Sequence, residues 1–105
     1  MSLHDADDLL WKAINILATS PKSLQYRVEE AVDSHIFHIL KDDLPEHLRD
    51  DFEALFEQIM KIKTKENENK FKSAKQVFSE KEALEIANKI LIFYYETSLE
   101  LYKKP

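Results

Sequence analysis

The sequence predicts an all-α protein, an antiparallel four-helix bundle with a long polar linker before the last helix. Three observations favour this fold class. Apolar residues recur at spacings of three and four along four segments of the 105-residue chain, as on one face of a helix. Residues that favour a helix start precede three of these segments. The chain has no glycine, so the Asn-Gly hairpin turns typical of an all-β fold are absent.

The first helix is expected over residues 5–19. Asp7 and Asp8 stand near its beginning, where negative charge interacts favourably with the helix dipole. The residues that follow are apolar apart from one thin polar stripe, made of Lys12, Asn15 and Thr19. A helix with so much apolar surface is expected to contact more than one neighbour.

The second helix is expected over residues 21–41. Ser20 is expected to cap its free N–H groups, and Pro21 suits the first helical position because its missing N–H is not needed there. The short connection to the first helix predicts that the two lie antiparallel. The stripe that follows consists of Leu24, Val28, Ala31, Val32, His35, Ile39 and Leu40.

The third helix is expected over residues 45–62, and its start has two alternatives. Either Asp43 caps it together with Glu46, or Leu44 is the cap and Pro45 the first residue. The amphipathic pattern after this start is the cleanest in the chain. Its apolar stripe consists of Leu48, Phe52, Leu55, Phe56, Ile59 and Met60.

Residues 63–78 are polar and rich in lysine, so a linker is expected there, before a fourth helix over residues 80–102. Ser79 and Glu82 have the spacing of a capping box, and Phe78 and Ala83 that of a hydrophobic staple. A second row of residues on this helix occupies a face adjacent to its main stripe. It contains Leu84, Leu91, Tyr95, Ser98 and Tyr102.

The composition excludes several classes of function and bounds the chain to a single domain, 1–105. Without glycine there is no P-loop, dinucleotide fingerprint or nucleophile elbow, and without cysteine there is no disulfide or thiolate zinc site. No cofactor is therefore expected. Residues 1–60 carry 5 basic and 13 acidic side chains, a net charge of −8 that repels phosphates, so no nucleic-acid partner is expected.

A cytoplasmic location without membrane contact is expected. The first apolar run is interrupted by Lys12 and Asn15 and preceded by acidic residues, unlike a signal peptide. No run approaches the ~20 apolar residues of a membrane span.

His35 and His38 are weak candidates for a metal site, because two imidazoles three residues apart on a helix could share an ion. The Glu-x-x-His motif of carboxylate-bridged bundle sites is absent from the sequence. The alternative is one half-buried structural histidine and one surface histidine.

Arg27 and His35 are weak candidates for catalysis, since eight residues is close to two helical turns and places both on one face. The pair resembles the Arg and His of small helical ribonucleases of the HEPN type, although the gap here is longer. That resemblance implies RNA cleavage; the alternative for Arg27 is an ion pair with an acidic neighbour.

A lysine-rich stretch around Phe71 could hold an acidic partner or an RNA backbone, with the ring stacking on a base. The alternative is a solvated linker. The lysines are Lys61, Lys63, Lys65, Lys70, Lys72 and Lys75.

The first and last expected helices have more apolar surface than one bundle seam needs, and such excess faces often form interfaces. We therefore expect self-association as a homodimer, or binding of an unidentified protein partner. The expected interface residues are Trp11, Ile14, Tyr95 and Tyr102.

The chain also resembles a family of small uncharacterised all-helical bacterial proteins. The resemblance implies a helical fold and bacterial origin but no activity, and the third connection departs from it by having Lys, Asn and Glu where relatives are richer in Gly. The matching pieces are Leu17-Ala18-Thr19-Ser20, Leu24-Gln25, Arg27, Asp43-Leu44-Pro45, Leu48, Phe52, Ser79, Glu82-Ala83, Ala87 and Ile90.

The sequence thus favours a non-catalytic protein–protein interaction or regulatory module. The alternative is a small helical RNA-binding or RNA-cleaving protein that uses Arg27 and His35.

Overall fold

The computed structural model describes residues 2–68 and 77–103. Helices dominate this part of the chain, and it contains no strand, so the all-α fold class is confirmed, as is the number of α-helices. The elements are α1 (Leu3–Thr19), α2 (Leu24–Ser34), the 3-10 helices η1 (Ile36–His38) and η2 (Lys41–Asp43), α3 (Glu46–Glu68) and α4 (Glu80–Lys103).

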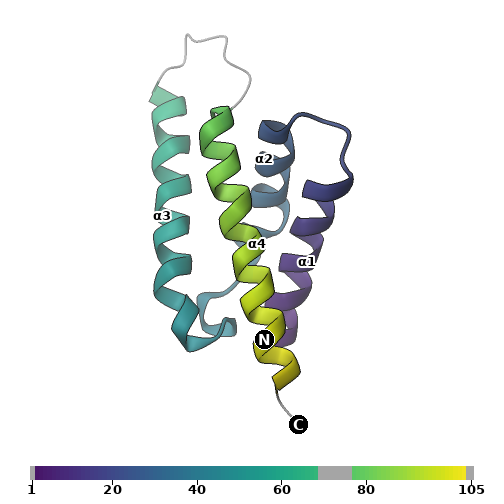
Figure 1. The fold of residues 1–105 in the computed structure, drawn as a ribbon. Helices are drawn as coiled ribbons and strands as arrows, with labels where there is room; N and C mark the ends of the chain where they lie inside the picture. The colour runs from purple at the N-terminus through teal and green to yellow at the C-terminus, as the bar shows by residue number, and fades with distance from the viewer. Residues whose placement is uncertain (1, 69–76, 104–105) are drawn as a thin grey trace.

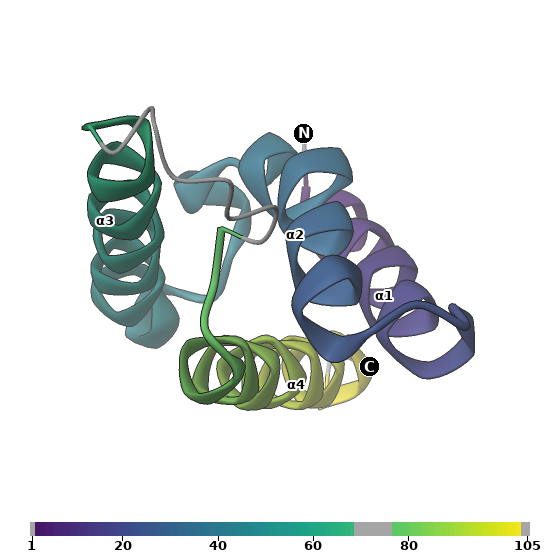
Figure 2. The same ribbon diagram turned by 90° about the horizontal axis from the view of Figure 1, so that it is seen from above.

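The last helix, α4, contacts each of the other three α-helices. It packs against α1 and α2, and on its other side it contacts α3 (Figures 1 and 2). α1 also packs against α2, whereas α3 contacts chiefly α4 and η2. The N-terminal end of α1 and the C-terminal end of α4 lie at the same end of the molecule (Figure 1). No described element covers the side of α4 that faces the viewer in Figure 1.

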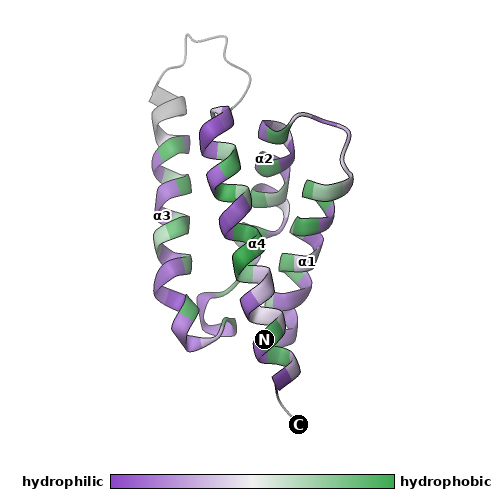
Figure 3. Cartoon of the chain, in the orientation of Figure 1, coloured by the Kyte–Doolittle hydropathy of each residue, from purple (hydrophilic) through white to green (hydrophobic). Residues whose placement is uncertain are grey.

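The core consists of the apolar stripes that the helical spacing predicts. Figure 3 shows hydrophobic residues along α1 and the middle of α4, while α3 alternates between hydrophilic and hydrophobic turns. The Phe52 and Phe93 rings meet edge to face, with 5.7 Å between their centroids, and join α3 to α4. The largest fully buried side chains include Leu10, Val28, Val32, Ile36, Leu44, Leu55, Ile59, Phe78, Ile86 and Ile90.

The second helix differs most from the expected range of residues 21–41. Its cap is Ser23, whose Oγ accepts a hydrogen bond from the Tyr26 N–H at 3.3 Å, and not Ser20. The helix ends at Ser34, and two 3-10 turns follow. An uninterrupted helix would carry the polar His35 on the face that buries Val28, which costs free energy. The break buries Ile36 instead and leaves His35 half-exposed at the helix end.

The third helix is longer than expected, and its start matches neither alternative. It begins at Glu46, directly after Pro45. Asp43 belongs to η2, and Leu44 is the residue that ends η2, so neither of them caps α3 as expected. Its C-terminal end extends to Glu68, so the expected linker at 63–78 begins too early. Residues 69–76 of that linker lie outside the described residues.

The first residue of the extension of α3, Lys63, contacts α2 and η1. Lys63 Nζ lies 3.0 Å from an Asp33 carboxylate oxygen and 5.9 Å from the centroid of the Phe37 ring. Lysine and glutamate are also good helix formers. A lysine-rich composition therefore does not end the helix.

The two remaining helices lie close to their expected bounds. α1 begins two residues earlier than expected, because Ser2 caps it by accepting a hydrogen bond from the Asp5 N–H. At the start of α4 the capping box is confirmed in both directions. The Ser79 N–H donates to Glu82 Oε1 at 2.9 Å, and the Glu82 N–H donates to Ser79 Oγ at 3.1 Å.

Candidate interaction surface

The outward side of α4 carries a row of exposed apolar side chains, interrupted by Asn88, which we call the α4 face. Helical spacing places all of its members within one stripe, opposite the stripe that buries Ile86 and Ile90. Soluble proteins expose single apolar residues commonly, but contiguous groups of this kind mark interaction sites. The α4 face consists of Leu84 (55% exposed), Leu91 (53%), Ile92 (57%), Tyr95 (61%), Leu99 (42%) and Tyr102 (83%).

The α4 face is concave as well as apolar, so a side chain of a partner could fit into it. A shallow hollow of about 570 Å³ lies along its C-terminal half. Apolar and aromatic side chains dominate its lining, with one hydroxyl from Ser98. The residues that line it are Leu91, Ile92, Tyr94, Tyr95, Ser98 and Tyr102.

Trp11 of α1 extends this surface. The Ser98 hydroxyl donates a hydrogen bond to Asp7 Oδ1 at 2.6 Å, which fixes the register between α1 and α4. One helical turn further along α1 stands Trp11, which is 50% exposed. Since α1 and α4 run in opposite directions (Figure 1), Trp11 is level with the turn of α4 that precedes Ser98.

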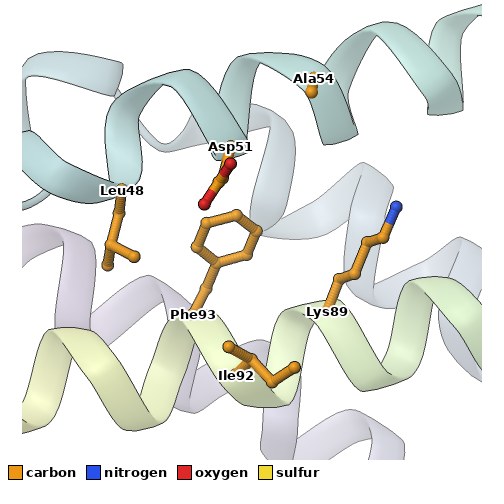
Figure 4. A pocket seen from close by; sticks show the side chains of 6 residues that line it. All are labelled: Leu48, Asp51, Ala54, Lys89, Ile92 and Phe93. Carbon is orange, nitrogen blue, oxygen red and sulfur yellow. The ribbon is translucent and has the colours of Figure 1, made fainter.

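A second pocket, of about 260 Å³, lies between α3 and α4 and shares Ile92 with the α4 face. Figure 4 shows the Phe93 ring pointing from α4 toward α3, where Leu48, Asp51 and Ala54 lie. Lys89 lies at the rim, and its Nζ donates to Gln58 Oε1 at 2.7 Å. This pocket has an apolar floor and one charge of each sign at its edge.

Three of the four expected interface residues are exposed, and one is not. Trp11, Tyr95 and Tyr102 lie on the surface just described, whereas Ile14 is partly buried and packs against the core. Sequence reasoning missed four residues of the α4 face as interface residues: Leu84, Leu91, Ile92 and Leu99. All four fall outside the main stripe of α4, and that is the signal that could have identified them.

Arg27 is committed to the main chain of the α1–α2 connection. Its Nη1 donates to the Leu17 carbonyl oxygen at 2.6 Å, and its Nε donates to the Lys22 carbonyl oxygen at 3.0 Å. Leu17 lies in the last turn of α1, where carbonyl groups lack partners within the helix. The side chain therefore ties the end of α1 to the start of α2.

His35 lies at the other end of α2, where its backbone N–H donates a hydrogen bond to the Ala31 carbonyl oxygen. Eight residues of helix separate it from Arg27, about 12 Å along the axis. Burial lowers the pKa of His35 below its ordinary value, and the nearby charges of Lys12 and His38 lower it further, against opposing effects of Asp8 and Glu30. The structure thus favours the neutral imidazole.

No metal-binding cluster accompanies the two histidines. His38 is exposed in η1, one residue short of the buried Ile39. Across residues 2–68 and 77–103 there is no group of three or more His, Asp or Glu side chains that could hold an ion.

The lysine-rich stretch lies largely outside the described residues. Of its members that the structure places, Lys61 is exposed on α3, and Lys63 is held by Asp33. None of the helices within residues 2–68 and 77–103 combines the length and the hydropathy of a membrane span.

Comparison of this chain with protein-family models, with curated proteins and with solved structures found no match.

Proposed function

We propose that this chain is a small non-catalytic protein–protein interaction module that self-associates as a homodimer through the α4 face and Trp11. The observation that carries the proposal is the row of six apolar side chains on α4 that stay 42–83% exposed in the described structure. The scaffold we propose is an antiparallel four-helix bundle with a polar linker before α4, in a bacterial cytoplasmic protein.

Energetics support an interface at this place. Apolar surface removed from water contributes roughly 25 cal/mol per Å². The exposed surface includes two tyrosines, a tryptophan and four aliphatic side chains, so a partner that covers it lowers the free energy of the system. Tyr and Trp are also the residue types enriched at interfaces, since each combines a large apolar ring with one polar group.

The arrangement of the polar candidates supports a non-catalytic function. Arg27 uses its guanidinium to hold main-chain carbonyl oxygens, and His35 ends α2 at a distance of two helical turns from it. Neither side chain lies on the α4 face. The surface with the most distinctive composition is thus an apolar one, which suits binding more than acid–base chemistry.

Size-exclusion chromatography with light scattering tests the proposal. The wild type is expected at twice the chain mass of 12.4 kDa. A Leu91→Glu variant is expected at the monomer mass, because a charge replaces the centre of the α4 face. Met60→Glu is the matched control, since Met60 is similarly exposed (42%) but lies on α3. A wild type that remains a monomer up to millimolar concentration contradicts the homodimer.

A further inference from the structure

Four residues of the α4 face and two polar residues between them form a seam with the spacing of a coiled coil. Its members follow one another at intervals of four, three, four, three and four residues, the alternation that keeps one side of a helix against a partner helix. Four are apolar and two are polar. The seam consists of Leu84, Asn88, Leu91, Tyr95, Ser98 and Tyr102.

We infer that the occupant of this seam is α4 of a second copy, running antiparallel to the first about a two-fold axis near residue 93. The inference rests on the proposed function and specifies its geometry. A two-fold axis makes an interface self-complementary, so each residue of the seam must suit the residue it meets.

The seam is self-complementary in the antiparallel orientation. An axis at residue 93 places Leu84 opposite Tyr102 of the second copy and Leu91 opposite Tyr95 of the second copy. A branched aliphatic side chain thus meets an aromatic ring at each apolar level. The two polar residues, Asn88 and Ser98, are also paired by this axis. The Ser98 hydroxyl already donates to Asp7, and its oxygen can still accept a hydrogen bond from the Asn88 amide.

The charges beside the seam favour the same orientation. Glu85 lies next to the seam near the start of α4, and Lys103 lies on the same side at its end. Antiparallel pairing brings Glu85 within two positions of Lys103 of the second copy, twice per dimer. Parallel pairing would instead place Glu85 and Lys103 of the second copy about 27 Å apart along the helices, so this ion pair could not form.

The available area matches a dimer of modest size. From the exposed fractions of the α4 face and Trp11, each copy can bury roughly 500–700 Å² of side-chain surface. Specific interfaces bury roughly 600–1,000 Å² per partner. Asn88 within the seam and Glu85 beside it add polar area to this total.

Disulfide cross-linking measures the orientation directly, because the natural chain contains no cysteine. Leu84→Cys and Tyr102→Cys proteins are prepared separately, mixed and oxidised. Antiparallel pairing is expected to give a disulfide-linked dimer in the mixture. Leu84→Cys alone should link poorly, since its two copies would lie about 27 Å apart along the axis. Met60→Cys on α3 is the control for random collision.

The other outcomes overturn the inference and separate it from the proposed function. Efficient linkage of Leu84→Cys with itself means a parallel dimer. A second outcome is that no combination links, while light scattering still finds a wild-type dimer and a Leu91→Glu monomer. This outcome means that the two copies meet in a different register. Both results contradict the antiparallel seam and leave the proposed homodimer standing. A monomeric wild type removes both.

Charge reversal gives a second test that does not alter the apolar residues. Glu85→Lys and Lys103→Glu are each expected to raise the dimer dissociation constant about 2- to 10-fold, as exposed ion pairs are weak. The double variant should return it toward the wild-type value. Equal weakening in the single and double variants would contradict the pairing.

Discussion

The Arg27 guanidinium donates to the carbonyl oxygen of Leu17 at 2.6 Å and so joins the start of α2 to the end of α1. A second donor of the same side chain reaches the Lys22 carbonyl oxygen. We expect Arg27→Ala to lower the free energy of unfolding by about 1–3 kcal/mol, because two hydrogen bonds from a charged group are lost. Urea unfolding followed by circular dichroism measures this.

Two comparisons make the Arg27 result specific. Arg27→Lys keeps the charge but not the planar pair of donors, so it should lose an intermediate amount of stability. Lys12→Ala removes an exposed ion pair to Asp8 and should change stability by at most ~0.5 kcal/mol. A different outcome would assign Arg27 a catalytic role: the wild type cleaves RNA, and Arg27→Ala has unchanged stability but no longer cleaves it.

Phe52 is expected to be among the most sensitive core positions, because its ring joins α3 to α4 through Phe93. Phe52→Ala should cost about 3–5 kcal/mol, the sum of lost burial and the cavity left behind. Met60→Ala on the same helix should cost far less, since Met60 is 42% exposed. Thermal unfolding of both variants checks this, and equal losses would contradict the assigned core.

The Phe52 and Met60 pair also illustrates what the sequence could predict. Spacing identified the stripe of α3 correctly for five of its six residues, because a helix that packs on one side buries residues of one face. It could not place the edge of that stripe, where Met60 lies. Which edge residue is covered depends on how far the neighbouring helix extends across it, and that is a property of tertiary packing.

Helix ends show the same division between local and tertiary causes. The capping box of Ser79 and Glu82 was predictable because both partners lie within four residues of each other. The break at His35 and the continuation of α3 past Lys63 were not, because each depends on contacts between elements distant in sequence. The α4 face was predictable in part, as Tyr95 and Tyr102 stood out while Ile92 did not.

His35 should make the stability depend on pH. Burial lowers its pKa in the folded chain, so between that pKa and the unfolded value of about 6.5 the unfolded state binds more protons. The free energy of unfolding should therefore decrease as the pH is lowered through 6.5. Urea unfolding at pH 7.5 and pH 5.5 measures the decrease.

The contribution of His35 can be separated from that of the carboxylates. His35→Gln stays neutral at both pH values and should show a smaller decrease than the wild type. His4→Gln is the control, because His4 is exposed near the start of α1 and should leave the decrease unchanged. Identical pH dependence in His35→Gln and the wild type would show that the imidazole does not contribute.

Lys63 and Asp33 should be energetically coupled, since their 3.0 Å contact holds the C-terminal part of α3 against α2. Lys63 is largely covered and lies over the Phe37 ring, so the contact is less screened than a fully exposed pair. A double-mutant cycle with Lys63→Ala and Asp33→Ala is expected to give a coupling of about 0.5–1 kcal/mol. The matched cycle on Lys12 and Asp8, an exposed pair within α1 at 3.1 Å, should give less. A Lys63 coupling near zero would mean that helix propensity alone, and not the contact with α2, extends α3 to Glu68.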